Sequence, residues 1–326
     1  MQSLSWQEQL AQAIRQPNDL LDYVGLEADS IGYSQQSIEL FPVRVPHAFA
    51  DRIQRNNPDD PLLRQIFPYI DEENDCEGYV NDPLAEANVQ PVQGLLHKYN
   101  SRVLFISTGA CAIHCRYCFR RHFPYQESST NGKHLKQSLD YIRTDETIKE
   151  VILSGGDPLT LSDRRLTELC HSISQIEHIK RIRFHTRIPV VLPARLSEKL
   201  IKQLANSGKT LVFVLHINHV NEIDDAVINN IKLLRRFNIL VLNQSVLLKG
   251  INDSTESLIA LSERLVENQV TPYYLHLLDP VAGAAHFNVD EQVAKILIQK
   301  MHESVSGYLV PKLVKEEVGK AGKTRV

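Results

Sequence analysis

Long apolar runs and an excess of one charge are both missing from this sequence of 326 residues. No apolar run approaches the roughly 20 residues that a membrane-spanning helix needs, so we expect no membrane span. The formal net charge is -3, which gives no electrostatic basis for sequence-independent binding to nucleic acid. The N-terminal residues lack the basic and apolar regions of a signal peptide, so we expect a reducing, cytoplasmic environment.

Cysteine is scarce, with five residues, yet Cys111, Cys115 and Cys118 lie within eight positions. Three is an odd number, which argues against a disulfide framework. A C-x3-C-x2-C loop can point three thiolates into one concavity. A cubane iron–sulfur cluster has four irons, so three thiolates leave one iron without a protein ligand. A structural zinc site needs four ligands, and only His114 and His122 leave that alternative open.

The arrangement of apolar residues predicts an α/β fold. Residues 1–95 are expected to be helical and loop-rich, beginning with the capping box Ser5-x-x-Glu8. From residue 102 on, apolar β-rich runs alternate with amphipathic stretches near 134–143, 163–176, 197–206, 223–236 and 256–267. One βα unit per interval indicates a parallel sheet, as in a partial barrel or a doubly wound open sheet. The predicted strands are Val103–Ser107, Glu150–Ser154, Arg181–Thr186, Leu211–His216, Leu240–Leu247 and Tyr273–Leu278.

Unusual polar residues gather where these predicted strands end, which is where α/β folds bind ligands. The segment Ser154-Gly155-Gly156-Asp157-Pro158 ends the second strand, and its two glycines remove Cβ atoms, so that a ligand can approach the backbone. The alternative is an ordinary strand-to-helix turn with Asp157 as a cap. His216 ends the fourth strand, Gln244 lies in the fifth and Asp279 follows the sixth.

Two basic features have two interpretations each. Arg120 and Arg121 follow the cysteine loop, and they form either a solvated face or a pair of guanidinium groups that bind a carboxylate. The glycine-bearing tail around Lys323 is either a frayed end or a loop whose lysine reaches a pocket and binds pyridoxal 5'-phosphate (PLP) covalently.

The cysteine loop, with an aromatic residue before its last cysteine, resembles the cluster loop of radical S-adenosylmethionine (SAM) enzymes. Over nearly the whole chain, the sequence resembles the lysine 2,3-aminomutase family of that superfamily, and within it the shorter bacterial branch that makes β-lysine for elongation factor P. The family stretches are Asn100–His122, Ser154–Leu159, Thr186–Pro193, Asn218–Glu222, Asn243–Leu248 and Pro272–Tyr274; those of the branch are Asn57–Gln65, Gly94–Tyr99 and Ser306–Leu313.

The resemblance implies a six-unit partial (β/α)6 TIM-like barrel. It implies an N-terminal helical region over 1–95, a radical SAM core over 96–290 and a C-terminal helix with a lysine-bearing tail over 291–326. The implied activity is isomerisation of L-lysine to β-lysine, as the (R) enantiomer. The implied cofactors are a [4Fe-4S] cluster, SAM and PLP. A one-electron reductant of the flavodoxin or ferredoxin type and a functional link to elongation factor P and its ligase are also implied.

The family's site residues carry over by position. For the cofactors, the resemblance assigns the cluster to Cys111, Cys115 and Cys118, the PLP linkage to Lys323, the PLP phosphate to Arg102, and SAM to Ser154, Gly155, Gly156, Asp157, His216 and Gln244. For the substrate, Arg120 matches a residue that pairs with the α-carboxylate. Asp279 and Glu316 match carboxylates that hold the ε-ammonium group.

Several departures from the family pattern bear on these assignments. Glu316 replaces an aspartate, the glycine run before Lys323 is thinned, and Arg325 replaces a common proline. The chain stops at Val326 without the family's long C-terminal extension, and Cys76 and Cys170 are not placed to replace the zinc-binding cysteines of larger members. A mutase for glutamate or ornithine and a non-catalytic iron–sulfur sensor are the alternatives. A glutamate enzyme should have a cation at the distal end of its pocket.

Overall fold

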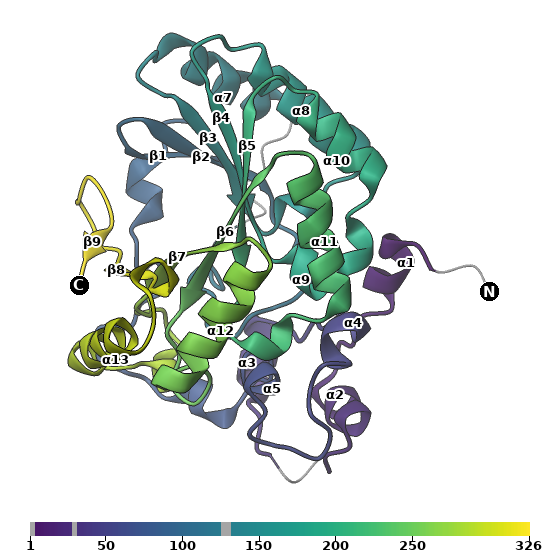
Figure 1. The fold of residues 1–326 in the computed structure, drawn as a ribbon, viewed down its shortest axis with the longest axis vertical. Coiled ribbons are helices and arrows are strands. Elements are labelled where there is room, and N and C mark those ends of the chain that lie inside the picture. The colour runs from purple at the N-terminus through teal and green to yellow at the C-terminus, as the bar shows by residue number, and fades with distance from the viewer. Residues whose placement is uncertain (1–3, 28–30, 125–131) are drawn as a thin grey trace.

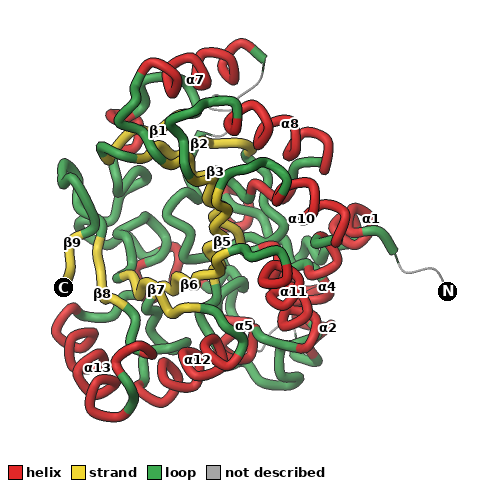
Figure 2. Tube along the Cα trace, turned by 45° about the horizontal axis from the view of Figure 1, so that its top comes forward, coloured by secondary structure: helices red, strands yellow, loops and turns green. Residues whose placement is uncertain are grey.

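A computed structural model describes residues 4–27, 31–124 and 132–326 of the chain, and its centre is one sheet with strand order β1 to β9. Each of the six predicted strands forms, and these six run parallel to one another. The sheet curves into an open arc (Figure 2), which confirms the partial barrel. The six strands are β2 (Arg102–Thr108), β3 (Glu150–Gly155), β4 (Arg181–Thr186), β5 (Thr210–His216), β6 (Leu240–Val246) and β7 (Thr271–His276).

Three further strands extend the sheet at its edges, and the sequence analysis did not predict them. β1 (Leu95–Tyr99) pairs antiparallel with β2, and β8 (Lys312–Lys315) pairs parallel with β7. β9 (Thr324–Arg325) pairs antiparallel with β8. β8 has four residues and β9 has two, which is too short to carry periodicity, so their pairing partners define them. The frayed-end interpretation of the tail is therefore wrong, because β9 holds the residues directly after Lys323 against the sheet.

Helices cover the outer face of the arc (Figures 1 and 2). Most begin after a Ser or Asp side chain that accepts a hydrogen bond from a first-turn N–H, a cap worth about 1 kcal/mol. None of the helices in the described parts of the chain is long and apolar enough to cross a membrane. The outer helices are α7 (Lys133–Thr144), α8 (Asp163–Ser174), α10 (Glu198–Ala205), α11 (Asp225–Arg236), α12 (Thr255–Glu267) and α13 (Glu291–Ser304).

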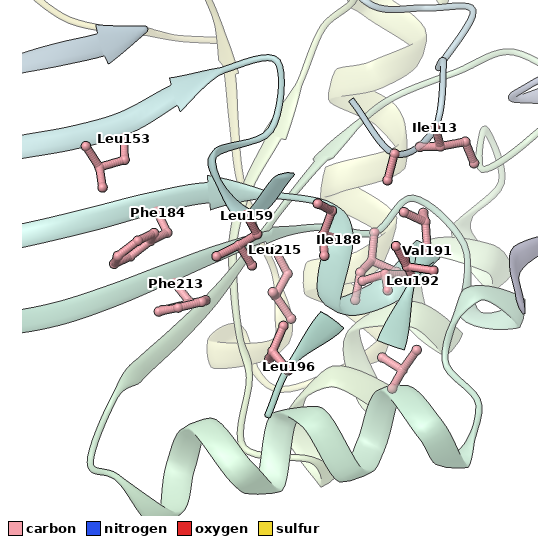
Figure 3. Packing of buried hydrophobic residues seen from close by; sticks show 14 of the residues in the cluster. Ile113, Leu153, Leu159, Phe184, Ile188, Val191, Leu192, Leu196, Phe213 and Leu215 are labelled. Atoms are coloured by element: carbon pink, nitrogen blue, oxygen red, sulfur yellow. The ribbon is translucent and has the colours of Figure 1, made fainter. Parts of the chain in front are cut away.

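The main hydrophobic core lies between the strands and these helices. On β4 and β5, the Phe184 and Phe213 rings stack with centroids 4.6 Å apart (Figure 3). Ile113 of the cysteine loop belongs to the same buried cluster as Val191 of the short helix α9 (Ile188–Val191), so the loop is fixed by apolar packing as well as by polar contacts.

The N-terminal region consists of short helices, as predicted, and the capping box between Ser5 and Glu8 is formed. Leu20 and Phe49 are fully buried and share the cluster that contains the strand residues. This region therefore packs directly on the barrel. Its helices are α1 (Trp6–Ala11), α2 (Pro17–Val24), α3 (Gln35–Leu40), α4 (His47–Ala50) and α5 (Pro61–Arg64), with 3-10 turns η2 (Ile70–Glu73) and η3 (Glu86–Val89).

Candidate active site

One cavity of about 380 Å³ lies within the arc, and every predicted site residue lines it. These residues come from the loops after β2, β3 and β7, from the strands β2, β3, β5 and β6 themselves, and from the C-terminal tail. Residues more than 200 positions apart in the sequence, such as Arg102 and Lys323, therefore border one space.

The cysteine thiols occupy one part of this cavity, and the surrounding protein makes them hard to ionise. Burial, and the neighbouring Cys115, raise the pKa of Cys118 to about 11. Burial, and then the Cys118 thiol, also raise the pKa of Cys111. Thiols in this setting ionise when a cation is supplied, and an iron–sulfur cluster supplies one. The three thiols thus form a donor set that fits such a cluster.

The geometry of these donors disfavours a single metal ion. In the described parts of the chain, no three His, Cys, Asp or Glu side chains converge closely enough to hold one ion. A cubane accepts wider spacing, because each sulfur binds a different iron. His114 Nδ1 lies 2.6 Å from the carbonyl oxygen of Pro42, and His122 Nε2 lies 3.1 Å from that of Ala282. Each of these bonds uses one ring nitrogen only, so the argument against the zinc alternative is the lack of a converging donor set in the described residues.

A buried ion-pair cluster anchors the cysteine loop to the N-terminal region. Glu72 is inaccessible to solvent and accepts hydrogen bonds from Arg116 Nε at 2.7 Å and from Arg121 Nη2 at 2.5 Å. Arg121 also donates to the Gly283 carbonyl oxygen at 3.1 Å. Arg121 is therefore not part of a solvated face: it ties the loop to two distant segments.

Gly155, the last residue of β3, and Gly156 have a packing role that the sequence analysis did not predict. A Cβ on Gly156 would lie 2.3 Å from the carbonyl oxygen of Ala110, and a Cβ on Gly155 would lie 2.5 Å from that of Thr108. Gly156 N–H donates to the Thr108 carbonyl at 2.8 Å, and Asp157 N–H donates to Ala110 at 2.8 Å. The missing side chains let this turn dock on the backbone that leads into the cysteine loop. Contact between this segment and SAM stays a prediction.

Replacement of Gly156 by alanine should destabilise the fold by about 1–3 kcal/mol, the usual penalty for overpacking, because the new Cβ overlaps backbone atoms that cannot rotate away. Urea unfolding measures this loss. Gly307→Ala is the matched control, since a Cβ at Gly307 meets nothing within 4 Å. Equal stability of the two variants would contradict the docking role.

The Asp157 carboxylate forms its hydrogen bonds within the protein itself. It accepts hydrogen bonds from the backbone N–H groups of Leu159 at 3.0 Å, Arg187 at 2.7 Å and Ile188 at 3.1 Å, and from the Thr186 hydroxyl at 2.8 Å. The cap interpretation left open by the sequence is therefore realised. This carboxylate joins the end of β3 to the end of β4, the two strands behind the cysteine loop.

Glu316 organises the basic part of the cavity. Its carboxylate accepts hydrogen bonds from Lys98 Nζ at 2.8 Å and Tyr99 Oη at 2.6 Å, and it pairs with Lys323 Nζ. Burial alone would raise the pKa of Glu316, but Lys323, Lys98 and Tyr99 together lower it to about 2. Burial lowers the pKa of Lys323 although Glu316 opposes this change. The sequence analysis missed Lys98 and Tyr99.

Arg102 fits a phosphate. Its guanidinium lies 4.2 Å from the centroid of the Tyr99 ring, which holds it at the cavity edge. In the described ranges no carboxylate lies within ion-pair distance of Arg102. A positioned guanidinium without an internal counter-ion suits an anionic ligand group.

Arg120 already has an anionic partner within the chain. Its Nε and Nη2 donate to both oxygens of Glu86, at 2.8 and 2.6 Å, and Nη1 donates to the Ser154 hydroxyl at 3.2 Å. Arg120 is buried, so the solvated-face interpretation is wrong for it too. A substrate carboxylate would have to share this guanidinium with Glu86, a partner that no local pattern indicated.

Histidines line the remaining wall of the cavity. The Gln244 amide donates to His216 Nε2 at 2.9 Å, and burial, followed by Arg187 and Arg120, lowers the pKa of His216 to about 3. His185 and His276 each have a buried Nε2 that finds no hydrogen-bond partner among the described residues, and a polar ligand would satisfy it. The sequence did carry a signal for His185: Arg181-Ile182-Arg183-Phe184-His185 alternates strictly, so its polar residues share the inner face.

The comparisons with known proteins agree with this geometry. The Radical SAM superfamily model matches residues 105–261. L-lysine 2,3-aminomutase of Escherichia coli strain K12 is 44% identical over 320 residues, which cover 98% of this chain and 93% of that protein. The chain belongs to the lysine 2,3-aminomutase family. Another lysine 2,3-aminomutase, from Clostridium subterminale, is 33% identical over 322 residues, covering 98% of this chain and 77% of that protein.

Solved structures give more distant matches. Streptococcus suis SuiB matches with a TM-score of 0.49 and 15% identity, covering 71% of this chain and 52% of that chain. A radical SAM methyltransferase from Sphaerobacter thermophilus matches with a TM-score of 0.48 and 17% identity, covering 68% of each chain.

Family membership makes this protein an enzyme, an isomerase of the radical SAM superfamily. A [4Fe-4S] cluster and SAM follow from the superfamily, and lysine 2,3-aminomutases use PLP. These findings confirm the predicted enzyme class and cofactors and remove the sensor alternative. The roles of individual residues stay predictions.

Proposed function

We propose that this enzyme converts L-lysine to (R)-β-lysine with PLP, SAM and a [4Fe-4S] cluster bound in the one cavity. The observation that supports this most is the shared lining: the three cysteines, Lys323, Arg102 and the carboxylates of Asp279 and Glu316 all border the same space. When bound, the cluster and SAM supply the radical that removes a hydrogen atom from the substrate, and PLP carries the amino nitrogen that migrates.

Lys323 and Arg102 would hold PLP at its two ends. Covalent attachment needs a neutral amine, and burial favours that form by lowering the pKa of Lys323. Glu316 contacts Lys323 Nζ directly and favours its charged form, so this ion pair must open before the amine can lose its proton and bind PLP. Lys98 and Tyr99 keep the Glu316 carboxylate fixed while Lys323 moves.

Charge would select and orient the substrate. Asp279 would provide an anion for the ε-ammonium group, and Arg120 would provide a cation for the α-carboxylate; both line the cavity, so a diamino acid could pair with both. A substrate without a terminal ammonium would leave Asp279 unpaired in a poorly solvated place, which costs binding energy. This argument favours lysine over glutamate.

The biological setting is part of the proposal. The resemblance of Asn57–Gln65 and Ser306–Leu313 to the branch that serves elongation factor P supports β-lysine as a precursor for that modification, with a separate ligase attaching it. The reductant would be a one-electron donor of the flavodoxin or ferredoxin type. An oxygen-sensitive cluster suits the reducing cytoplasm.

The direct test is anaerobic incubation of the reconstituted enzyme with L-lysine, SAM, PLP and a reductant. Chiral separation with mass spectrometry follows the product, and we expect (R)-β-lysine. If the cluster is intact and SAM is cleaved but no β-lysine forms, the substrate assignment is wrong, and glutamate and ornithine are tested next.

Activity should fall on the acid side of pH 7. The surrounding protein desolvates Asp279 and raises the pKa of its carboxyl to about 7; Glu316 raises it further, and Lys323 opposes. Below pH 7 the carboxyl is protonated and neutral, so it no longer attracts the ε-ammonium group. We expect kcat/KM for L-lysine to fall by up to about tenfold per pH unit below 7.

The control for this prediction is Asp279→Asn, which is uncharged at every pH. Its kcat/KM should be low throughout and should lack the acid limb. A wild-type profile that stays flat from about pH 5 to 8 would show that Asp279 does not bind the substrate cation.

A further inference from the structure

Arg187, the residue directly after β4, makes a contact with the cysteine loop that the assigned roles do not explain. Its Nη1 lies 2.7 Å from Cys115 Sγ and 2.7 Å from Tyr117 Oη. The side chain is only 6% exposed. Because this guanidinium is shielded from water, its hydrogen bond to the sulfur is stronger when the sulfur is a thiolate than when it is a neutral thiol.

Both terminal nitrogens of Arg187 are fully committed, so the guanidinium cannot turn away from the sulfur. Nη2 donates to Gln65 Oε1 at 2.6 Å and to Glu222 Oε2 at 2.9 Å, which uses its two hydrogens as Nη1 uses its own on Cys115 and Tyr117. Glu222 is inaccessible to solvent and is itself held by the backbone N–H of Asn218 at 2.9 Å. The donor is positioned before any cluster binds.

The effect of such a donor on a cluster has a definite sign. One-electron reduction adds a negative charge to the cluster, and a cation or an N–H donor at a ligating sulfur stabilises that more negative state. In a poorly solvated place the effect is stronger than in water. Glu222 offsets part of the charge, but it lies on the far nitrogen, so the cationic group is the one that faces the sulfur.

We propose that Arg187 is a positioning residue that donates a hydrogen bond to the Cys115 thiolate and raises the reduction potential of the cluster. Through that bond it makes the cluster easier to reduce by the one-electron donor. This inference rests on the proposed cluster at Cys111, Cys115 and Cys118. It adds a residue that sets how readily that cluster accepts an electron.

The test is a potentiometric titration of the reconstituted full chain, followed by electron paramagnetic resonance, after iron and sulfide have been measured. For Arg187→Gln we expect about a tenfold lower ratio of reduced to oxidised cluster at a fixed potential, which is 59 mV for a one-electron couple. Arg187→Lys keeps a positive charge but loses the planar guanidinium, so its reduction potential should fall by less than that of Arg187→Gln. Arg195→Gln is the matched control: Arg195 is equally buried, bonds to Leu159 and Leu161 carbonyls and does not line the cavity.

A merely structural role would change cluster loading or thermal stability but would not move the midpoint of the clusters that do load. A wild-type midpoint in loaded Arg187→Gln overturns the inference, and so does an equal shift in Arg195→Gln. If Arg187→Gln takes up no cluster, Arg187→Lys decides: a lowered midpoint supports the inference and an unchanged one overturns it. A wild-type chain that loads no cluster refutes the proposed cluster site itself.

Discussion

Cys118→Ala should abolish both cluster binding and turnover. With two thiolates left, the loop can no longer hold a cubane that keeps one iron open, so SAM has nowhere to bind. The loss of activity should exceed the roughly 100-fold that is lost when a residue hydrogen-bonded to a metal ligand is removed. Iron and sulfide analysis, visible absorbance and β-lysine formation under anaerobic conditions measure the effect.

The chain supplies its own control for this experiment. Cys76 is exposed and does not line the cavity, so Cys76→Ala should keep the full iron content and wild-type activity. Cys170 is a buried residue of α8 that does not line the cavity, so alanine there leaves a small void without touching the site. Retention of a wild-type cluster in Cys118→Ala would refute the ligand assignment.

Lys323→Ala should lose covalent attachment of PLP and nearly all lysine aminomutase activity. Without the anchor the cofactor is held by Arg102 and its neighbours alone, and misplacement of a reacting group by about 1 Å can cost about 100-fold in rate. Borohydride reduction followed by peptide mass spectrometry should place PLP on Lys323 in the wild type and on no peptide in the variant.

Lys320→Ala is the matched control, because Lys320 is an exposed lysine three positions earlier in the same tail. It should keep both labelling and activity. The cluster provides a second control: Lys323→Ala should keep the wild-type iron content, since the tail does not contact the cysteine loop through any hydrogen bond in the described residues. Detection of reduced PLP on Lys320 or on another lysine would show that Lys323 is not the residue that binds PLP.

Local signals in the sequence were sufficient for the repeating part of the fold. The alternation of β-rich runs with amphipathic stretches predicted β2 to β7 within one or two residues at most boundaries. It could do so because the burial pattern of each strand or helix depends on a few consecutive residues. The edge strands β8 and β9 were missed for the opposite reason. Each is only a few residues long, and a strand of that length exists because a neighbour pairs with it.

The same division applies to the site. The spacing of Cys111, Cys115 and Cys118 indicated a cluster loop, and the placement of polar residues at strand ends indicated a common site, since both are properties of neighbouring residues and of parallel-sheet geometry. Substrate and PLP depended on resemblance to a family. The sequence also suggested that Gly155 and Gly156 open space for a ligand, which stays a prediction; it did not indicate that they also pack against the backbone before the cysteine loop.

By itself, then, the sequence determined the α/β fold class and the polar residues that meet in one cavity, and it predicted the donor set for the cluster. Only the tertiary structure decided the partners of the charged groups: Glu86 lies 34 residues from Arg120, Cys115 lies 72 from Arg187, and Lys98 lies 218 from Glu316. A buried charge must find a counter-charge or a donor wherever packing brings one. Periodicity and spacing record which residues are buried, but they do not record which buried residues face one another.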